Sequence, residues 1–212
     1  MRKSLFVSIC FTSALIFALL SEMAFANASI SLPTAQRSLT VYIPPPETVT
    51  ETAPAPVADV EWMPISARLN QRMATRSGPS SLYTEELGTV PQSTEIVVFW
   101  QEDTGVSWAM VEYYSRNGKL YRAYTGMKRI DADGEVPELS AARQKAVIVP
   151  DIRPYYGPGA QYEPVPHTLR GGMIVEVCCK EREYALIEYL HPTETEKKFR
   201  AWVPVSALKE LR

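Results

Sequence analysis

The chain has 212 residues, a formal charge of −2 at neutral pH and a hydrophobic share of 46%, which suffices for one or two small domains. Its basic residues are scattered, so it lacks the electrostatic footprint of a protein that binds nucleic acid or an anionic membrane. With only three cysteines in the chain, a framework of several disulfides is excluded by count.

Residues 1–26 have the pattern of a secretory signal peptide. A short basic start is followed by the apolar run Leu5–Leu20 and by the triplet Ala24–Ala26, which predicts cleavage between Ala26 and Asn27. An uncleaved anchor is the less favoured alternative, because the run is shorter than the roughly 20 residues that span a bilayer. We expect a secreted or extracytoplasmic protein, located in the cell envelope and not in the membrane after cleavage.

Residues 27–64 are rich in proline and threonine, with Pro44–Pro46 as the densest point. The segment has no hydrophobic periodicity, and a chain of this composition cannot bury enough apolar surface to offset its ordering entropy. We expect a disordered linker. The apolar patch Leu39–Ile43 is either a strand that docks elsewhere or simply part of this tether.

The rest of the chain contains one pattern twice. Gly78-Pro79 is followed by Tyr83, and Gly157-Pro158 is followed by Tyr162 at the same interval. The later matches, in the same order, are Trp108–Tyr113 with Tyr184–Tyr189 and Arg122–Tyr124 with Arg200–Trp202, at offsets of 76 to 79 residues. Such order indicates internal duplication. We predict two domains, residues 65–133 and 144–212, joined by an inter-domain linker at 134–143.

Both copies are predicted to be all-β. Short apolar runs alternate with turn residues at intervals of about 8 to 12 residues, as in a sandwich or barrel, and Asn117-Gly118 is a strong hairpin signal. A single register then gives both copies the same types of cross-strand pair. The pairs are Glu112–Arg122, Tyr113–Tyr121 and Val111–Ala123 in the first copy, and Glu188–Arg200, Tyr189–Phe199 and Ile187–Ala201 in the second.

This register sorts the side chains into two faces. The small and apolar face, suited to the interior of a narrow barrel, consists of Ala109, Val111, Tyr113, Tyr121 and Ala123, with Ala185, Ile187, Tyr189, Phe199 and Ala201 as counterparts. The large, amphipathic face consists of Trp108, Met110, Glu112, Arg122 and Tyr124, with Tyr184, Leu186, Glu188, Arg200 and Trp202 as counterparts. Two interpretations of the second face stay open. Either it packs on the outer surface or the other copy, or it is a partly exposed aromatic platform for a peptide or glycan.

The order of these motifs resembles the bacterial Src-homology-3-like (SH3b) family. Its most specific points here are Gly78-Pro79, Gly157–Gly159 and Arg200–Val203, while the first copy has Ala123–Thr125 where the family has Gly-Trp-Val, and Tyr184 replaces a tryptophan. The resemblance implies small five- or six-stranded β-barrels. It also implies secretion, attachment to cell-wall hydrolases and binding of wall peptides or other envelope components, without catalysis by the module itself.

The candidate ligand-binding residues follow from the amphipathic face. They are Tyr83, Trp108, Tyr124, Tyr162, Tyr184 and Trp202, with Glu112, Arg122, Glu188 and Arg200 as possible polar support. We expect Tyr83 and Tyr162 to lie in mobile loops that close over the same surface, because loops on a rigid scaffold often carry binding residues.

The sequence gives no indication of an enzyme. His167 and His191 do not neighbour a serine or cysteine that needs a base, no metal-ligand spacing is present, and Asp131–Gly134 lacks the later ligands of a calcium loop. We therefore predict no catalytic residue, metal or cofactor. The adjacent Cys178 and Cys179 should point to opposite faces of a strand, one buried and one partly exposed; an intermolecular disulfide is the alternative.

Two functions remain. The first is a non-catalytic module that recognises a wall peptide, a glycan or an extracellular protein. The second is an assembly component, in which the two barrels and the N-terminal arm associate with other chains, for example by β-augmentation.

Overall fold

The computed structural model describes residues 62–84, 88–140 and 142–211. The predicted signal peptide, the patch Leu39–Ile43 and nearly all of the proline-rich linker therefore lie outside the described residues. Within them, the regular elements are β-strands and two short 3-10 helices, and all of them belong to one compact unit. The predicted all-β fold is confirmed.

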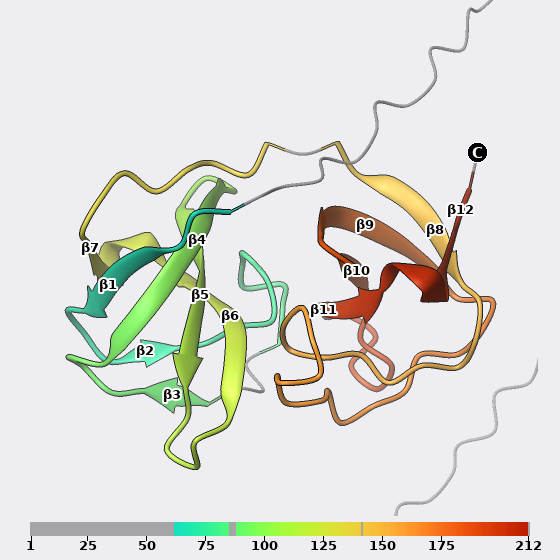
Figure 1. Cartoon of the computed structure of the whole chain (residues 1–212), viewed down its shortest axis with the longest axis horizontal. Coiled ribbons are helices and arrows are strands. Elements are labelled where there is room, and N and C mark those ends of the chain that lie inside the picture. Colours follow the sequence, from blue (N-terminus) through green and yellow to red (C-terminus); the bar gives the residue numbers. More distant parts are fainter. Residues whose placement is uncertain (1–61, 85–87, 141, 212) are drawn as a thin grey trace, which may run out of the picture. The chain divides into compact units, whose positions relative to one another are not determined.

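The first copy of the pattern forms a five-stranded antiparallel sheet, which we call repeat 1 (residues 65–132; Figure 1). In sheet order its strands are β6 (Leu120–Gly126), β5 (Ser107–Tyr114), β4 (Glu95–Asp103), β1 (Ile65–Leu69) and β7 (Ile130–Ala132). The 3-10 helix η1 (Met127–Arg129) joins β6 to β7, and β2 (Met73–Ala74) pairs separately with β3 (Thr89–Val90).

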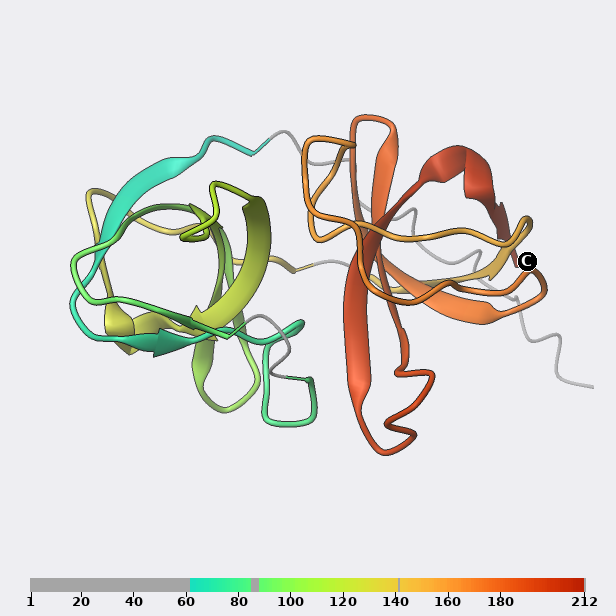
Figure 2. The ribbon, with the colours of Figure 1, turned by 90° about the horizontal axis from the view of Figure 1, so that it is seen from below.

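The second copy repeats this topology as a second five-stranded sheet, repeat 2 (residues 144–210; Figure 2). Its strands, again in sheet order, are β11 (Lys198–Pro204), β10 (Tyr184–Leu190), β9 (Ile174–Glu181), β8 (Gln144–Ile148) and β12 (Leu208–Glu210), with η2 (Val205–Ala207) before β12. Matched strand orders in the two copies agree with the duplication read from the sequence.

The predicted hairpin register is confirmed in both repeats. Glu112 lies opposite Arg122 on β5 and β6, and Glu188 lies opposite Arg200 on β10 and β11, with all the neighbouring pairs as expected. In repeat 1 the turn contains Gly118 at φ +73°, a conformation that glycine adopts without steric cost.

The predicted interior residues also form the cores. Ala109, Val111, Tyr113 and Ala123 are at most 4% exposed in the core of repeat 1, and their four counterparts and Phe199 occupy the core of repeat 2. Tyr121 is partly buried and packs against both cores. Full burial of one such aliphatic side chain stabilises a fold by about 1.5–3 kcal/mol, so these faces supply the main apolar contribution of each repeat.

A β-bulge interrupts the long strand of each repeat. The pairing of β4 with β5 skips Phe99, and the pairing of β9 with β10 skips Cys178. A bulge breaks the alternation of faces, so that Cys178 and Cys179 are both buried in the same outer cluster. The prediction that one of the two thiols is partly exposed is therefore wrong. Burial raises the pKa of the Cys178 thiol to about 11, which disfavours its reactive thiolate form.

Candidate functional site

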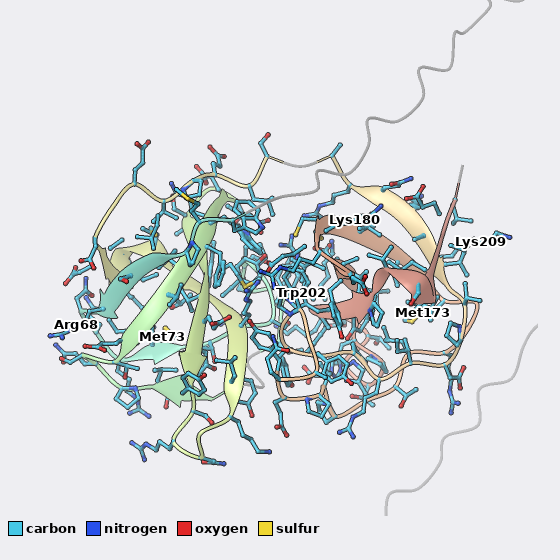
Figure 3. All side chains as sticks on the ribbon, in the orientation of Figure 1. Arg68, Met73, Met173, Lys180, Trp202 and Lys209 are labelled. Carbon is cyan, nitrogen blue, oxygen red and sulfur yellow. The ribbon has the colours of Figure 1, made fainter. Side chains whose placement is uncertain are left out.

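The amphipathic faces of the two repeats bury each other. Trp100 and Trp202 meet edge to face with ring centroids 6.5 Å apart, and Figure 3 shows Trp202 among the side chains between the two sheets. The cluster around them consists of Phe99, Trp100, Met110 and Tyr124 from repeat 1 and Cys178, Cys179, Leu186 and Trp202 from repeat 2. This apolar contact joins the two sheets.

The aromatic residues predicted to bind ligand divide into two groups. Tyr124 and Trp202 are fully buried in this cluster, and Tyr83 and Tyr162 are 5% exposed. The prediction that these four side chains are exposed is therefore wrong, because the other repeat covers them. Trp108 and Tyr184 are partly buried at the margin of the cluster, and their role in binding stays a prediction.

Arg200 lies at the centre of a buried polar network. Its Nε donates to Glu188 Oε2 at 2.9 Å within repeat 2, and its Nη1 donates to Glu102 Oε1 at 2.7 Å across the contact. The same Nη1 donates to the hydroxyl of Tyr124 at 2.8 Å. Nη2 has no hydrogen-bond partner among the described residues, but the guanidinium lies 5.4 Å from the ring centroids of both Tyr83 and Tyr124, where π faces attract a cation.

Arg122 makes the equivalent contacts from the other side. Its Nε donates to Glu112 Oε2 at 2.9 Å within repeat 1, and its Nη1 donates to Glu181 Oε2 of repeat 2 at 2.6 Å. Its guanidinium also lies 3.7 Å from the ring centroid of Phe99. Each arginine therefore binds one carboxylate on its own hairpin and one on the other repeat.

The two loop tyrosines complete the network by crossing between repeats. The Tyr83 hydroxyl donates to Glu188 of repeat 2, and the Tyr162 hydroxyl donates to Glu112 of repeat 1. Backbone bonds reinforce the exchange, since the Lys198 amide donates to the Leu82 carbonyl at 2.9 Å. The expected mobile loops are thus docked on the neighbouring repeat.

The Gly-Pro motifs have a steric role in this exchange. A Cβ atom added to Gly78 would lie 2.2 Å from Cδ1 of Tyr83, and one added to Gly157 would lie 2.1 Å from Cδ1 of Tyr162. Such distances are far below van der Waals contact, so each tyrosine ring can lie against the backbone only where glycine stands. The glycine and the tyrosine five residues later act as one unit.

The charges of the network hold each other ionised. Burial alone would raise the pKa of Glu188, but the charge of Arg200 and hydrogen bonds from Lys198, Tyr83 and Arg200 outweigh burial and lower it to about 2. Burial raises the pKa of Tyr83 above its ordinary value. With its ionised groups paired, the network stabilises the contact and presents no activated acid, base or nucleophile.

Sequence reasoning missed the two carboxylates that cross the contact. Glu102 and Glu181 lie at equivalent positions near the ends of β4 and β9, 79 residues apart. The Gly-Pro motifs and the two loop tyrosines have this same offset. Alignment of the two copies beyond the hairpins would therefore have found this pair.

An open groove lies on the outer face of repeat 1. It has a volume of about 640 Å³ and is lined by residues of β1, β4, β5 and β7, by Leu120 at the start of β6 and by Asp133 after β7. Arg68, which Figure 3 shows at the outer side of this sheet, pairs with Glu95 at 3.4 Å, and both are exposed. Asp131 and Asp133 add negative charge, and Tyr114 is 68% exposed. The groove thus combines carboxylates with an uncovered aromatic ring.

A smaller groove occupies the equivalent place in repeat 2. It has a volume of about 230 Å³ and lies over β8 to β11. Ile174 and Leu190, which are 62% and 58% exposed, supply its apolar part, and the charges of Lys145 and Lys198 are balanced by those of Glu176 and Glu188. The two grooves share a position in the fold but differ in charge.

The two histidines have structural contacts. His167 Nε2 lies 2.8 Å from the hydroxyl of Tyr189, and His191 Nδ1 accepts a hydrogen bond from the Glu194 amide at 3.1 Å. Burial and the neighbouring His191 lower the pKa of His167 to about 4. Among residues 62–84, 88–140 and 142–211, no group of three metal-ligating side chains occurs. A helix with the length and apolarity to cross a membrane is also absent from these ranges.

Comparison with known proteins gives little further information. No family model and no curated protein matches the chain. Two solved structures from Trichomonas vaginalis align with it, NlpC2 at 10% identity and a TM-score of 0.27, and NlpC1 at 9% and 0.26. The alignments cover 71% and 72% of this chain but 49% and 48% of those chains, so it spans about half of their length. Similarity at this level carries no argument about fold or activity.

Proposed function

We propose that the chain is a non-catalytic binding protein of the cell envelope, exported by its signal peptide and built from two SH3-like (SH3b) repeats. The ordered motifs around Gly78-Pro79 and Gly157-Pro158 support the family, as do two five-stranded sheets of the same strand order. The contacts of His167 and His191 and the paired carboxylates favour binding over catalysis, because each has a structural partner.

The observation that carries this proposal is the groove on the outer face of repeat 1. The aromatic faces are occupied by the contact between repeats, whereas this groove stays open and recurs in repeat 2. Glu95, Asp131 and Asp133 suit free amino groups, and Tyr114 and Leu120 suit an apolar side chain. The ligand that combines both is a peptide with free amino groups, such as a wall peptide.

The contact between the repeats supports the same function. The arginine and tyrosine contacts described above hold the repeats together through charged hydrogen bonds, which are stronger than neutral ones. Two grooves carried by one unit can engage two segments of a polymer, and linked sites increase overall affinity without new contacts. A polymeric ligand, such as the cell wall, therefore gains most from the tandem arrangement.

Co-sedimentation with purified cell walls tests the proposal. Tyr114→Ala removes the exposed ring of the groove and is expected to weaken wall binding about tenfold, or about 1.4 kcal/mol, without a change in thermal unfolding. Val149→Ala is the matched control, because Val149 is 57% exposed and lines neither groove; it should bind as the wild type does.

Two outcomes would contradict the proposal. Equal wall binding by Tyr114→Ala and the wild type would exclude the groove as the binding site. Absence of wall binding together with a mass in solution that rises with concentration would replace the binding function by the assembly function.

A further inference from the structure

A second pocket lies in repeat 1, apart from the outer groove. It has a volume of about 230 Å³ and is enclosed by the ends of β2, β5 and β6, the turn before β5, and η1. Its lining shares no residue with the groove proposed for the wall ligand. Any ligand of this pocket is therefore additional to the proposed function.

The lining of this pocket is strongly basic. Arg76, Lys128 and Arg129 all contribute to it, and none of the lining residues that the structure describes is acidic. Lys128 and Arg129 form no ion pair with a carboxylate of the described residues; Arg129 Nη1 donates only to the Arg72 carbonyl, at 3.4 Å. Arg76 Nη1 donates to the Tyr83 carbonyl at 3.0 Å. The charges of Lys128 and Arg129 repel each other, so an anion bound beside them would relieve the repulsion.

Two further features of the pocket suit a ligand with an oxygen-rich anionic group. Thr125 is one of the lining residues, and its hydroxyl is buried and has no hydrogen-bond partner among the described residues, which is uncommon for a buried polar atom. Trp108 lies opposite Gly126 in the sheet. Its half-buried indole forms one flat, apolar wall of the pocket.

The equivalent region of repeat 2 differs in the residues that matter. In the repeat alignment Lys128 and Arg129 correspond to Ser206 and Ala207, and Thr125 corresponds to Val203. The two cations of η1 and the threonine hydroxyl are therefore not repeated at these positions, and the pocket lined by Tyr184, Pro204 and Ser206 in repeat 2 carries Glu183 beside Lys180 and Arg182. General requirements of the fold do not account for the two cations and the hydroxyl, since repeat 2 forms the same sheet without them.

From this geometry we infer that the pocket bounded by Trp108, Gly126, Lys128 and Arg129 binds an oxyanion, a carboxylate or a phosphate, carried on a flat or apolar group. The cations bind the oxyanion, which Arg and Lys do in proteins through charge-assisted hydrogen bonds. Trp108 packs on the attached group. In this proposal, the group that carries the oxyanion is the ligand that Trp108 contacts.

NMR titration of the full chain tests the inference. Phenyl phosphate, benzoate and inorganic phosphate are added to ¹⁵N-labelled protein, with sodium chloride at equal ionic strength and neutral benzyl alcohol as references. We expect saturable shifts of the Trp108 indole and the Lys128 amide with phenyl phosphate or benzoate, and weaker binding of inorganic phosphate. A preference between the first two identifies phosphate or carboxylate as the source.

Two pocket variants and two controls extend the test. Lys128→Ala combined with Arg129→Ala should weaken binding about tenfold or more. Gly126→Leu should block the pocket while the fold is kept, because φ at Gly126 is −64° and an added Cβ would meet nothing within 4 Å. Arg116→Ala removes an exposed cation outside the pocket and should bind normally, as should the groove variant Tyr114→Ala.

The inference is overturned if no oxyanion gives saturable shifts beyond the chloride reference, or if benzyl alcohol binds as well as the anions. Wild-type affinity in both pocket variants would also overturn it. Because Tyr114→Ala affects only the wall ligand and Gly126→Leu only the oxyanion, failure of one proposal is distinguishable from failure of the other.

Discussion

Arg200 shows how a single residue ties the two repeats together. Its side chain is 1% exposed, and its carboxylate partners Glu188 and Glu102 are 3% and 12% exposed on different repeats. Removing one partner of a buried ion pair leaves an uncompensated charge, which typically costs about 3–5 kcal/mol. The stability of the contact therefore depends on this arginine more than on any exposed ion pair.

We predict that Arg200→Met lowers the free energy of unfolding by about 3–5 kcal/mol, measured by urea denaturation. The methionine retains the apolar stem but leaves Glu188 and Glu102 without their shared partner. The control is Arg170→Met, since Arg170 and Asp151 are 81% and 51% exposed, and exposed pairs contribute little. If both variants unfold at the same urea concentration, the buried network is not a major source of stability.

At the scale of elements, the hairpins were predictable and the bulges were not. Asn117-Gly118 fixes the turn of one hairpin, and the second copy provides an independent check on the register that follows. The bulges at Phe99 and Cys178 depend on contact with the other repeat, where two successive side chains must face the same cluster. Strict alternation within one strand cannot reveal such a requirement.

The candidate site was predicted in part for the same reason. The pairs Glu112–Arg122 and Glu188–Arg200 follow from local register, and the structure has both. The crossing of Tyr83 to Glu188 and the burial of Trp202 arise from packing between repeats. Sequence periodicity reports which residues share a face, but not what covers that face.

The β10–β11 hairpin carries a pH-dependent contact. The rings of His167 and His191 lie 5.0 Å apart, both next to Phe199. Since the pKa of His167 is about 4 in the fold and about 6.5 in an unfolded chain, the unfolded state binds the proton more readily. Stability from this residue is complete above pH 6.5 and is lost as the pH falls towards 4.

We therefore predict that the free energy of unfolding decreases between pH 7 and pH 4.5, and that His167→Gln reduces this decrease. Denaturation of both proteins at the two pH values measures it. Glu188, with a pKa of about 2 in the fold, stays ionised throughout this range. A glutamate in the unfolded chain has a pKa of about 4.3 and binds protons only near the lower end of the range, so Glu188 contributes little to the difference. An equal pH dependence in wild type and variant would refute the role of His167.

For the whole molecule, the contact predicts that the two repeats unfold together. Tyr83 and Tyr162 each donate to a carboxylate of the other repeat, and hydrogen bonds to charged groups contribute about 1.5–3 kcal/mol each. We predict a single calorimetric transition whose van't Hoff and calorimetric enthalpies agree.

The double variant Tyr83→Phe with Tyr162→Phe should weaken this coupling. Both hydrogen bonds are lost while the rings still cover Gly78 and Gly157, so the transition should broaden or separate into two. Tyr114→Phe, at a 68% exposed position, is the control and should leave one sharp transition. Two separate transitions in the wild type would show that the repeats are energetically independent.

The exchange of tyrosines also has an evolutionary consequence. Each repeat uses a tyrosine and an arginine to bind carboxylates of the other repeat. Such a surface is self-complementary, as in an isologous homodimer. A single ancestral repeat with these residues would pair with a second copy of itself, and gene fusion would make that dimer permanent. Fusion then frees the two halves to diverge in sequence. The present chain has Phe99-Trp100 on one side and the small Cys178-Cys179 on the other.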